Sequence, residues 1–236
     1  MASNLTRKAL LKQDKFTVEV EHTVDYVAAH RKQAMRYGGV ALAVIAIAAA
    51  VYYYRGAQQS ARQQMLGESI ALTSAPVAAT PPPGGGPSFP NETAKDAAVT
   101  KALTKVTTDY NGSEEAYIAE YLLAGRAVDA GKLDDARRKY QDVADHAGAN
   151  YASLAKLALA QILIAENRGA DGEKLLKDLM DHPTDLVSKA QATIAYAKAI
   201  APTRTEEARK LLVALAGQAS ETSTIAVAAM NDLPQK

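Results

Sequence analysis

Four histidines and a few neighbouring acids are the residues of this chain that could do chemistry. His146 and His182 stand 36 residues apart and each follows an aspartate, whereas His22 and His30 lie near the start of the chain. Neighbouring helices pack about 10 Å apart, so equivalent positions on them are too widely separated to share one metal ion. A histidine at a helix C-terminus, where partial positive charge suits the helix dipole, fits positions 146 and 182 better.

The acids also lie in arrangements typical of exposed helices. Glu114-Glu115 and Asp134-Asp135 are adjacent pairs, so on a helix their carboxylates point in different directions and cannot act as a catalytic pair. Both pairs fit the first turn of a helix, where negative charge is favourable. The chain has no cysteine, which excludes disulfides and thiolate metal sites. We therefore predict no catalytic residue, no cofactor and no metal site, and an enzyme is kept only as an alternative.

The segment Tyr37–Tyr54 is the strongest structural signal in the chain. It has 18 residues without a charge, and as a helix it is roughly 27 Å long, close to the thickness of a bilayer core. Its terminal tyrosines fit the two membrane–water interfaces. A soluble core helix normally has a polar face, which this segment lacks. We predict a single transmembrane helix, with a buried core helix and a cleaved signal peptide as the alternatives.

The distribution of charge predicts the orientation of this helix. Residues 1–36 contain seven Lys and Arg, whereas the twenty residues after the segment contain two. Basic flanks stay in the cytoplasm, so the C-terminal part is expected outside a bacterial inner membrane, in the periplasm. Residues 92–236 have 18 basic and 21 acidic side chains, a balance that argues against nucleic-acid binding.

The remaining regions differ clearly in composition. Residues 1–36 form the predicted cytoplasmic tail, with an amphipathic helix that either docks a partner or lies on the inner leaflet. Residues 37–54 form the span, and residues 55–90 a juxtamembrane helix and a linker rich in proline and glycine. We expect this linker to let the domain at residues 91–236 stand away from the membrane. The apolar stripe of the tail helix is Phe16, Val20, Val24 and Val27.

The C-terminal domain contains a helical pattern that repeats every 36 residues. In each unit a small residue is followed four positions later by a large residue and three further on by an apolar one. Such units stack because a single hairpin cannot bury its own apolar face. The predicted repeat core is Ala136, Tyr140, Val143, Gly172, Leu176, Leu179, Ala208, Leu212 and Leu215.

Three features outside the repeat core complete this prediction. Gly131 and Asn167 occupy the same turn in the first two units, and Thr203 with Glu206 indicates a capping box in the third. An earlier helix should pack on the first unit through Val99, Leu103 and Val106. A last helix should close the far end through Ile225, Val227 and Met230.

The first unit, with its glycine turn, Ala136, Tyr140 and Val143, resembles the second half of a tetratricopeptide repeat. The resemblance implies an all-α fold in which a single N-terminal transmembrane helix precedes an α-solenoid of tetratricopeptide-like hairpins. An independent helical bundle is the alternative. In the repeat register, the first helices of the hairpins present a partner-binding groove made of Tyr117, Tyr121, Val128, Leu157, Gln161 and Ile164.

In layout the chain looks like the YfgM-like family of ancillary subunits of the bacterial SecYEG translocon. The resemblance is most specific at residues 157–167 and 228–234. It implies a membrane-anchored scaffold without catalysis, whose partners are the translocon, emerging polypeptides and periplasmic chaperones. A scaffold for cell-envelope assembly is the alternative. The small residues of the span would also allow helix pairing, so a homo-oligomer remains open.

Overall fold

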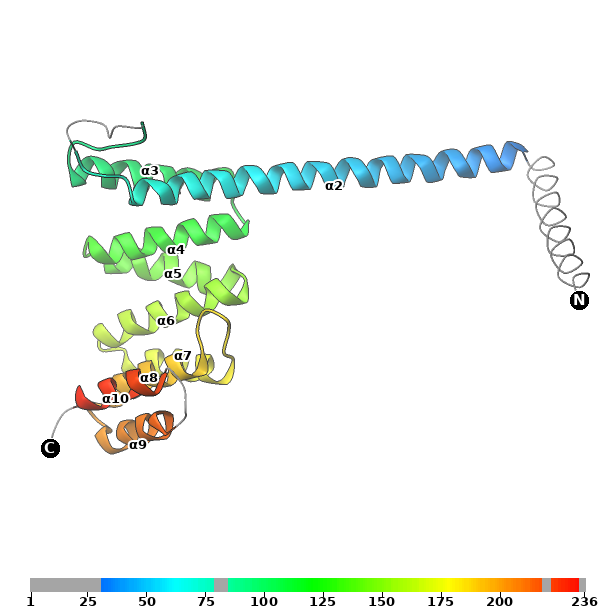
Figure 1. Cartoon of the computed structure of the whole chain (residues 1–236). Helices are drawn as coiled ribbons and strands as arrows, with labels where there is room; N and C mark the ends of the chain where they lie inside the picture. The colour runs from blue at the N-terminus through cyan, green and yellow to red at the C-terminus, as the bar shows by residue number, and fades with distance from the viewer. Residues whose placement is uncertain (1–30, 79–84, 218–221, 234–236) are drawn as a thin grey trace, which may run out of the picture. The chain divides into compact units, whose positions relative to one another are not determined.

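The computed structural model describes residues 31–78, 85–217 and 222–233, which form helices joined by loops (Figure 1). Within these residues β-type pairing is limited to an isolated bridge between Val77 and Phe89. The predicted all-α fold is therefore confirmed. The helices are α2 (Arg31–Thr73), α3 (Glu92–Asp109), α4 (Glu114–Asp129), α5 (Leu133–His146), α6 (Ala149–Ala165), α7 (Gly169–Asp181), α8 (Lys189–Ile200), α9 (Thr205–Ala216) and α10 (Thr222–Asn231).

The chain divides into two compact units, residues 1–60 and residues 61–236. In the first unit the structure describes the first part of α2, which is long and apolar enough to cross a membrane and has no buried residue in its apolar window. Tyr37 and the three tyrosines at positions 52–54 are exposed. The predicted stripe of Phe16, Val20, Val24 and Val27, and also His22 and His30, lie outside the described residues.

The second unit is a series of antiparallel hairpins. α4 packs on α5, α6 on α7 and α8 on α9, and α5 and α7 also contact the first helix of the next hairpin. The first helices α4, α6 and α8 contact one another in the same order (Figure 1). Each hairpin therefore covers the apolar face of its neighbour, which is how a solenoid builds a continuous core.

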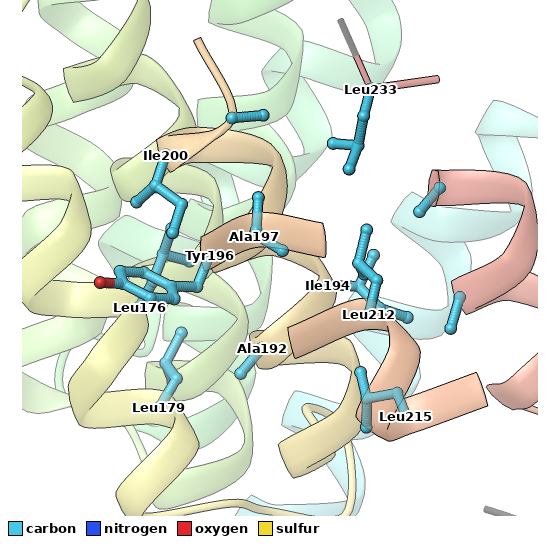
Figure 2. Close-up of a cluster of buried hydrophobic side chains, with 14 of the residues drawn as sticks. Leu176, Leu179, Ala192, Ile194, Tyr196, Ala197, Ile200, Leu212, Leu215 and Leu233 are labelled. Atoms are coloured by element: carbon cyan, nitrogen blue, oxygen red, sulfur yellow. The ribbon is translucent and has the colours of Figure 1, made fainter. Parts of the chain in front are cut away.

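All nine positions of the predicted repeat core are buried. Ala136, Tyr140 and Val143 lie in one apolar cluster with residues of α4 and α6. A second cluster is centred on α8 and is shown in Figure 2. It contains Leu176 and Leu179 of α7 and the three core positions of α9. In that view Leu176 and Leu179 of α7 lie on the same side as Tyr196, whereas Leu212 and Leu215 of α9 lie on the other side of Ala192.

Gly172 stands where the other two units have alanine, and the packing explains the difference. A Cβ atom on Gly172 would lie 2.7 Å from Ile164 Cγ1 and 2.8 Å from the Ala160 carbonyl oxygen. The second contact is with backbone, which cannot move aside as a side chain can. At this point α6 and α7 therefore approach so closely that only glycine fits.

The turns after α4 and α6 share one backbone conformation. Gly131 has a φ of 71° and Asn167 a φ of 62°. In each turn the following N–H donates to a carbonyl oxygen five residues back, Lys132 to Ala127 at 2.8 Å and Arg168 to Leu163 at 2.8 Å. This is the Schellman ending of a helix, which requires a left-handed residue such as glycine or asparagine. The predicted equivalence of Gly131 and Asn167 is confirmed.

The capping box predicted for the third unit is wrong. Helix α9 begins at Thr205 after the N-cap residue Arg204, and no side chain caps it. The Thr203 hydroxyl donates to the Ile200 carbonyl oxygen at 3.3 Å. The N–H groups of Thr203 and Arg204 donate to the same oxygen. Thr203 therefore belongs to the turn that closes α8, and it is not free to cap α9.

Hydrogen bonds join the described flanks of the segment rich in proline and glycine, for which composition predicts a linker. The Ala78 N–H donates to the Phe89 carbonyl oxygen at 2.9 Å, and the Phe89 N–H donates to the Pro76 carbonyl oxygen at 3.1 Å. Residues 76–78, which follow α2, are thus joined to Phe89, which precedes α3. Proline and glycine indicate a loop, but they do not reveal whether its two flanks pack together.

The last turns of α2 lie in the same unit as the hairpins. Leu66 is buried in an apolar cluster with Val99 and Leu103 of α3 and Leu123 of α4. The predicted contact of α3 with the first hairpin is therefore present, and α2 contributes to it. Helix α2 extends from Arg31 to Thr73, so it includes both the apolar segment and Leu66.

Helix α10 covers the end of the solenoid with a different face from the one predicted. Ile225 is 57% exposed and Val227 is 44% exposed, whereas Met230 is partly buried. Ala226 and Ala229 of α10 are buried, as is Leu233, which follows the helix. Small side chains face the core because they let α10 approach α8 and α9 closely, and this favours the alanine stripe over the larger residues.

The close contact at Gly172 gives a test of the packing. We expect Gly172→Ala to lower the free energy of unfolding by about 1–3 kcal/mol, because α6 and α7 must separate to admit the methyl group. Chemical denaturation of the detergent-solubilised chain, followed by circular dichroism, measures this change. Gly169→Ala is the matched control, since a Cβ there meets nothing within 4 Å. An equal loss of stability in both variants would contradict the prediction.

Candidate functional site

Two adjoining cavities lie along the first helices of the hairpins. The larger, of about 400 Å³, lies between α4, α5 and α6, and the smaller, of about 280 Å³, lies between α6, α7 and α8. Gln161 of α6 lines both cavities and its side chain is exposed. We call this pair of cavities the groove. Its position follows from the stacking, because α4, α6 and α8 lie next to one another along the same side of the solenoid.

Three of the six predicted groove residues line these cavities. Val128 lies in the larger cavity, Ile164 in the smaller one, and Gln161 in both. The structure therefore brings Val128 and Gln161 together across α4 and α6.

The other three predicted groove residues are used in packing. Tyr121 lies edge-on to Tyr140 and to Tyr151, with ring centroids 5.4 Å and 6.2 Å away. Tyr117 stacks on the His146 ring, with centroids 6.4 Å apart. Leu157 packs against the apolar cluster around α8. These large side chains fill the space between helices, so none of the three lines the groove.

Small residues that the sequence reading missed make the groove possible. The larger cavity is lined by Gly125, Ala158 and Ala165, and the smaller by Ala195 and Ala199. Small side chains at these positions leave space between neighbouring first helices. A signal was present in the sequence of two first helices, because Ala158 and Ala165 are seven residues apart on α6 and Ala195 and Ala199 are four residues apart on α8, so each pair lies on one helix face.

The groove is mainly apolar, with sparse charge near its two ends. Asp129 lines the larger cavity and Lys198 lines the smaller one. The Lys198 ammonium also lies 3.8 Å from the Asp232 carboxylate, so it is already paired. Between these charges the exposed Gln161 amide can both donate and accept a hydrogen bond. Such a surface suits a short extended segment with apolar side chains, whose backbone needs a polar partner.

Tyr140 supplies a second polar group to the larger cavity. Burial raises the pKa of Tyr140 to about 12, so its hydroxyl is protonated at neutral pH and remains a hydrogen-bond donor. The hydroxyl lies near Gly125, where an added Cβ would be 3.5 Å from it. An alanine at this position would therefore place its methyl group in van der Waals contact with the hydroxyl.

The histidines that the structure describes lie at helix ends, as predicted. His146 is the last residue of α5, and His182 follows α7 directly. Each ring Nδ1 lies 3.1 Å from an aspartate one turn earlier, Asp142 and Asp178 respectively. Within the described ranges, no group of three or more acids, histidines or cysteines is placed to hold a metal ion.

The arrangement defines the class of protein as an α-solenoid of helical hairpins with a groove along its first helices. Comparison with protein families matches residues 34–185, more than half of the chain, to the family described as tetratricopeptide repeat-like domain. The chain therefore belongs to the tetratricopeptide repeat-like domain family. The match starts within α2 and ends in the loop before α8. Neither curated proteins nor solved structures give a match.

Membership in this family indicates the general role of the repeat domain. Such repeat domains mediate protein–protein interactions and typically serve as scaffolds without catalysis. The groove has the properties that this role needs, since it is apolar, open and lined by residues of several helices.

Substitution of Gly125 tests whether the stability of the fold requires glycine at this position of the groove. We expect Gly125→Ala to raise the free energy of unfolding by up to about 1 kcal/mol, because alanine favours a helix and its Cβ meets only an ordinary contact. The same methyl group narrows the larger cavity. Denaturation of the full chain in detergent measures the gain, and a loss of stability would show that the helices need glycine here.

Proposed function

We propose that the protein is a membrane-anchored scaffold that holds apolar segments of other proteins in its groove. The observation that carries this proposal is the pair of adjoining apolar cavities joined at Gln161. A bound segment would lie across α4, α6 and α8, with side chains in the cavities and its backbone at the Gln161 amide. Alternating apolar pockets and a polar backbone contact are a common way to bind extended peptides.

We propose further that the apolar part of α2 is retained as a membrane span at residues 37–54. Its exposed tyrosines at both ends and its uncharged surface support a span. The excess of Lys and Arg before the segment supports a cytoplasmic N-terminus and a periplasmic solenoid. A groove tethered to the outer face of the inner membrane would meet polypeptides as they emerge.

On this basis we propose the Sec translocon and envelope chaperones as partners. The support is the YfgM-like layout of the sequence together with an apolar groove suited to unfolded segments. Assembly of the cell wall or of the outer membrane uses scaffolds of the same layout, and the identity of crosslinked partners separates the two roles.

Crosslinking from inside the groove tests the binding role. A photoreactive amino acid at Gln161 should crosslink to translocon subunits, chaperones or emerging chains, whereas one at Val213 on α9 should not. Val213 is the matched control because it is 55% exposed and lies outside the groove. Val128→Glu should reduce the Gln161 crosslinks several-fold, and Val213→Glu should leave them unchanged. Equal crosslinking from both positions would contradict the proposal, and wall-synthesis partners would favour the alternative role.

Accessibility of single cysteines tests the orientation. The natural chain has no cysteine, so one introduced residue gives an unambiguous signal. In intact cells with a permeable outer membrane, we expect Ala214→Cys to react with a membrane-impermeant maleimide. Lys32→Cys should react only after the inner membrane is opened. The reverse pattern would contradict a periplasmic solenoid.

A further inference from the structure

The two charged residues that line the groove have opposite signs. Asp129 is the last residue of α4 and lines the larger cavity, whereas Lys198 on α8 lines the smaller one. The positions equivalent to Asp129, at intervals of 36 residues, hold Ala165 and Ala201. An acid is also unfavourable at the C-terminus of a helix, where the dipole carries partial negative charge. Neither the repeat nor the helix therefore accounts for Asp129.

The basic residues nearest to Asp129 in the sequence do not neutralise it. Arg126 donates to the Asp96 carboxylate of α3 at 2.6 Å. Arg126 and Lys132 both line a separate cavity between α3, α4 and α5. Within the residues that the structure describes, Asp129 takes part in no ion pair. It is thus an exposed, unpaired acid at a mainly apolar cavity.

The charge of Asp129 acts on the wall of the larger cavity. Burial, the Tyr121 phenol and the Asp129 carboxylate all raise the pKa of Tyr140, whose side chain lines this cavity. A nearby negative charge has this effect because it opposes the loss of the phenol proton. A charged group of a ligand in the cavity would meet the same field.

Two exposed apolar side chains line the same cavity as Asp129. Val128 is 36% exposed and Leu133 is 38% exposed. The side chains of lysine and arginine combine an apolar stem with a cationic head, so they can cover apolar surface and reach a carboxylate at the same time. The larger cavity offers both kinds of contact to such a side chain.

The smaller cavity has the opposite electrostatic preference. The Lys198 ammonium lies 3.8 Å from the Asp232 carboxylate, and both side chains are more than half exposed. An exposed pair of this kind is weak, so Lys198 still disfavours a cation beside it. Apolar side chains of a ligand can pack on Ile164, Ala195 and Ala199 in this cavity without such a penalty.

We propose that the groove selects extended segments that carry a lysine or arginine at one end and apolar residues along the rest. This proposal rests on the peptide-binding role proposed above. The basic side chain enters the larger cavity, where its stem packs on Val128 and Leu133 and its head pairs with Asp129. The apolar residues extend past Gln161 to the smaller cavity. Because Lys198 disfavours the reversed placement, Asp129 sets both the specificity and the direction of the bound chain.

Crosslinking of designed peptides from inside the groove tests the proposal. The full chain in detergent, with a photoreactive amino acid at Gln161, is titrated with biotinylated peptides of alternating leucine and serine. The peptides differ only in one terminal residue, which is lysine, norleucine or glutamate, placed at either end. Norleucine has the stem of lysine without its charge. We expect half-maximal crosslinking of the best lysine peptide at about fivefold lower concentration than that of its norleucine counterpart, the effect of one exposed ion pair.

Two acids at helix ends supply the matched variants. Asp129→Lys should reverse the preference, so that glutamate peptides bind best and lysine peptides worst. Asp181→Lys should leave the preference unchanged, because Asp181 is the exposed last residue of α7 and lines neither cavity. Both replacements place a cation at a helix C-terminus, where it is favourable, so both variants should fold. If Asp129→Lys does not fold, Asp129→Asn decides, and it should remove the difference between lysine and norleucine peptides.

The outcomes separate this proposal from the binding role on which it rests. Equal binding of all peptides, with stronger crosslinking from Gln161 than from Val213, would overturn the role of Asp129 and leave the groove as a binding site. The same change of preference in Asp181→Lys would assign the effect to net charge and would also overturn it. Crosslinking from Gln161 no stronger than from Val213 with every peptide would refute the groove itself, and this proposal with it.

Discussion

The structure of residues 61–236 depends on each hairpin burying an apolar face that belongs partly to its neighbour. Ala136, Tyr140 and Val143 on α5 are buried by helices of two hairpins, α4 and α6. Leu176 and Leu179 of α7 meet α8 in the same way. No hairpin could do this alone, because one helix pair leaves half of its apolar surface exposed. Stacking order, helix spacing and the position of the groove all follow from this shared burial.

The size of the side chains at the contacts sets how closely the helices approach. At Gly172 the helices α6 and α7 touch so closely that a methyl group has no room. On the first helices, small residues such as Ala158, Ala165 and Ala195 leave open space. The same residue class therefore serves two purposes. Between the helices of a hairpin it allows contact, and along the first helices it leaves a groove.

Much of the fold could be predicted from the sequence because the residues that become buried recur at a regular interval. The interval of 36 residues located the core positions of α5, α7 and α9, and all nine are buried. The turns could be matched because only glycine or asparagine readily adopts the positive φ that Gly131 and Asn167 share. These features depend on local conformation and on spacing within one repeat.

The features that sequence reasoning missed depend on tertiary contacts, that is, on which face of a helix packs against which neighbouring segment. In α10 nearly every residue is small or apolar, so the pattern does not choose between the stripe with Ile225 and the stripe with Ala226. Tyr117 and Tyr121 have the chemistry of binding anchors, but they fill gaps against His146 and Tyr140. The hydrogen bonds that join Phe89 to residues 76 and 78, on either side of the proline segment, form a tertiary contact that composition does not encode.

The last turns of α2 have a practical consequence for any soluble version of the solenoid. Cutting the chain after the proline segment, where composition suggests a domain border, would remove Leu66 and uncover Val99 and Leu103. It would also leave the mostly buried Glu115 carboxylate without the Arg62 guanidinium, whose Nε donates to it at 3.1 Å. A fragment that begins near Ala61 keeps this first layer covered. The C-terminal turns of α2 are thus part of the hydrophobic core of the repeat domain.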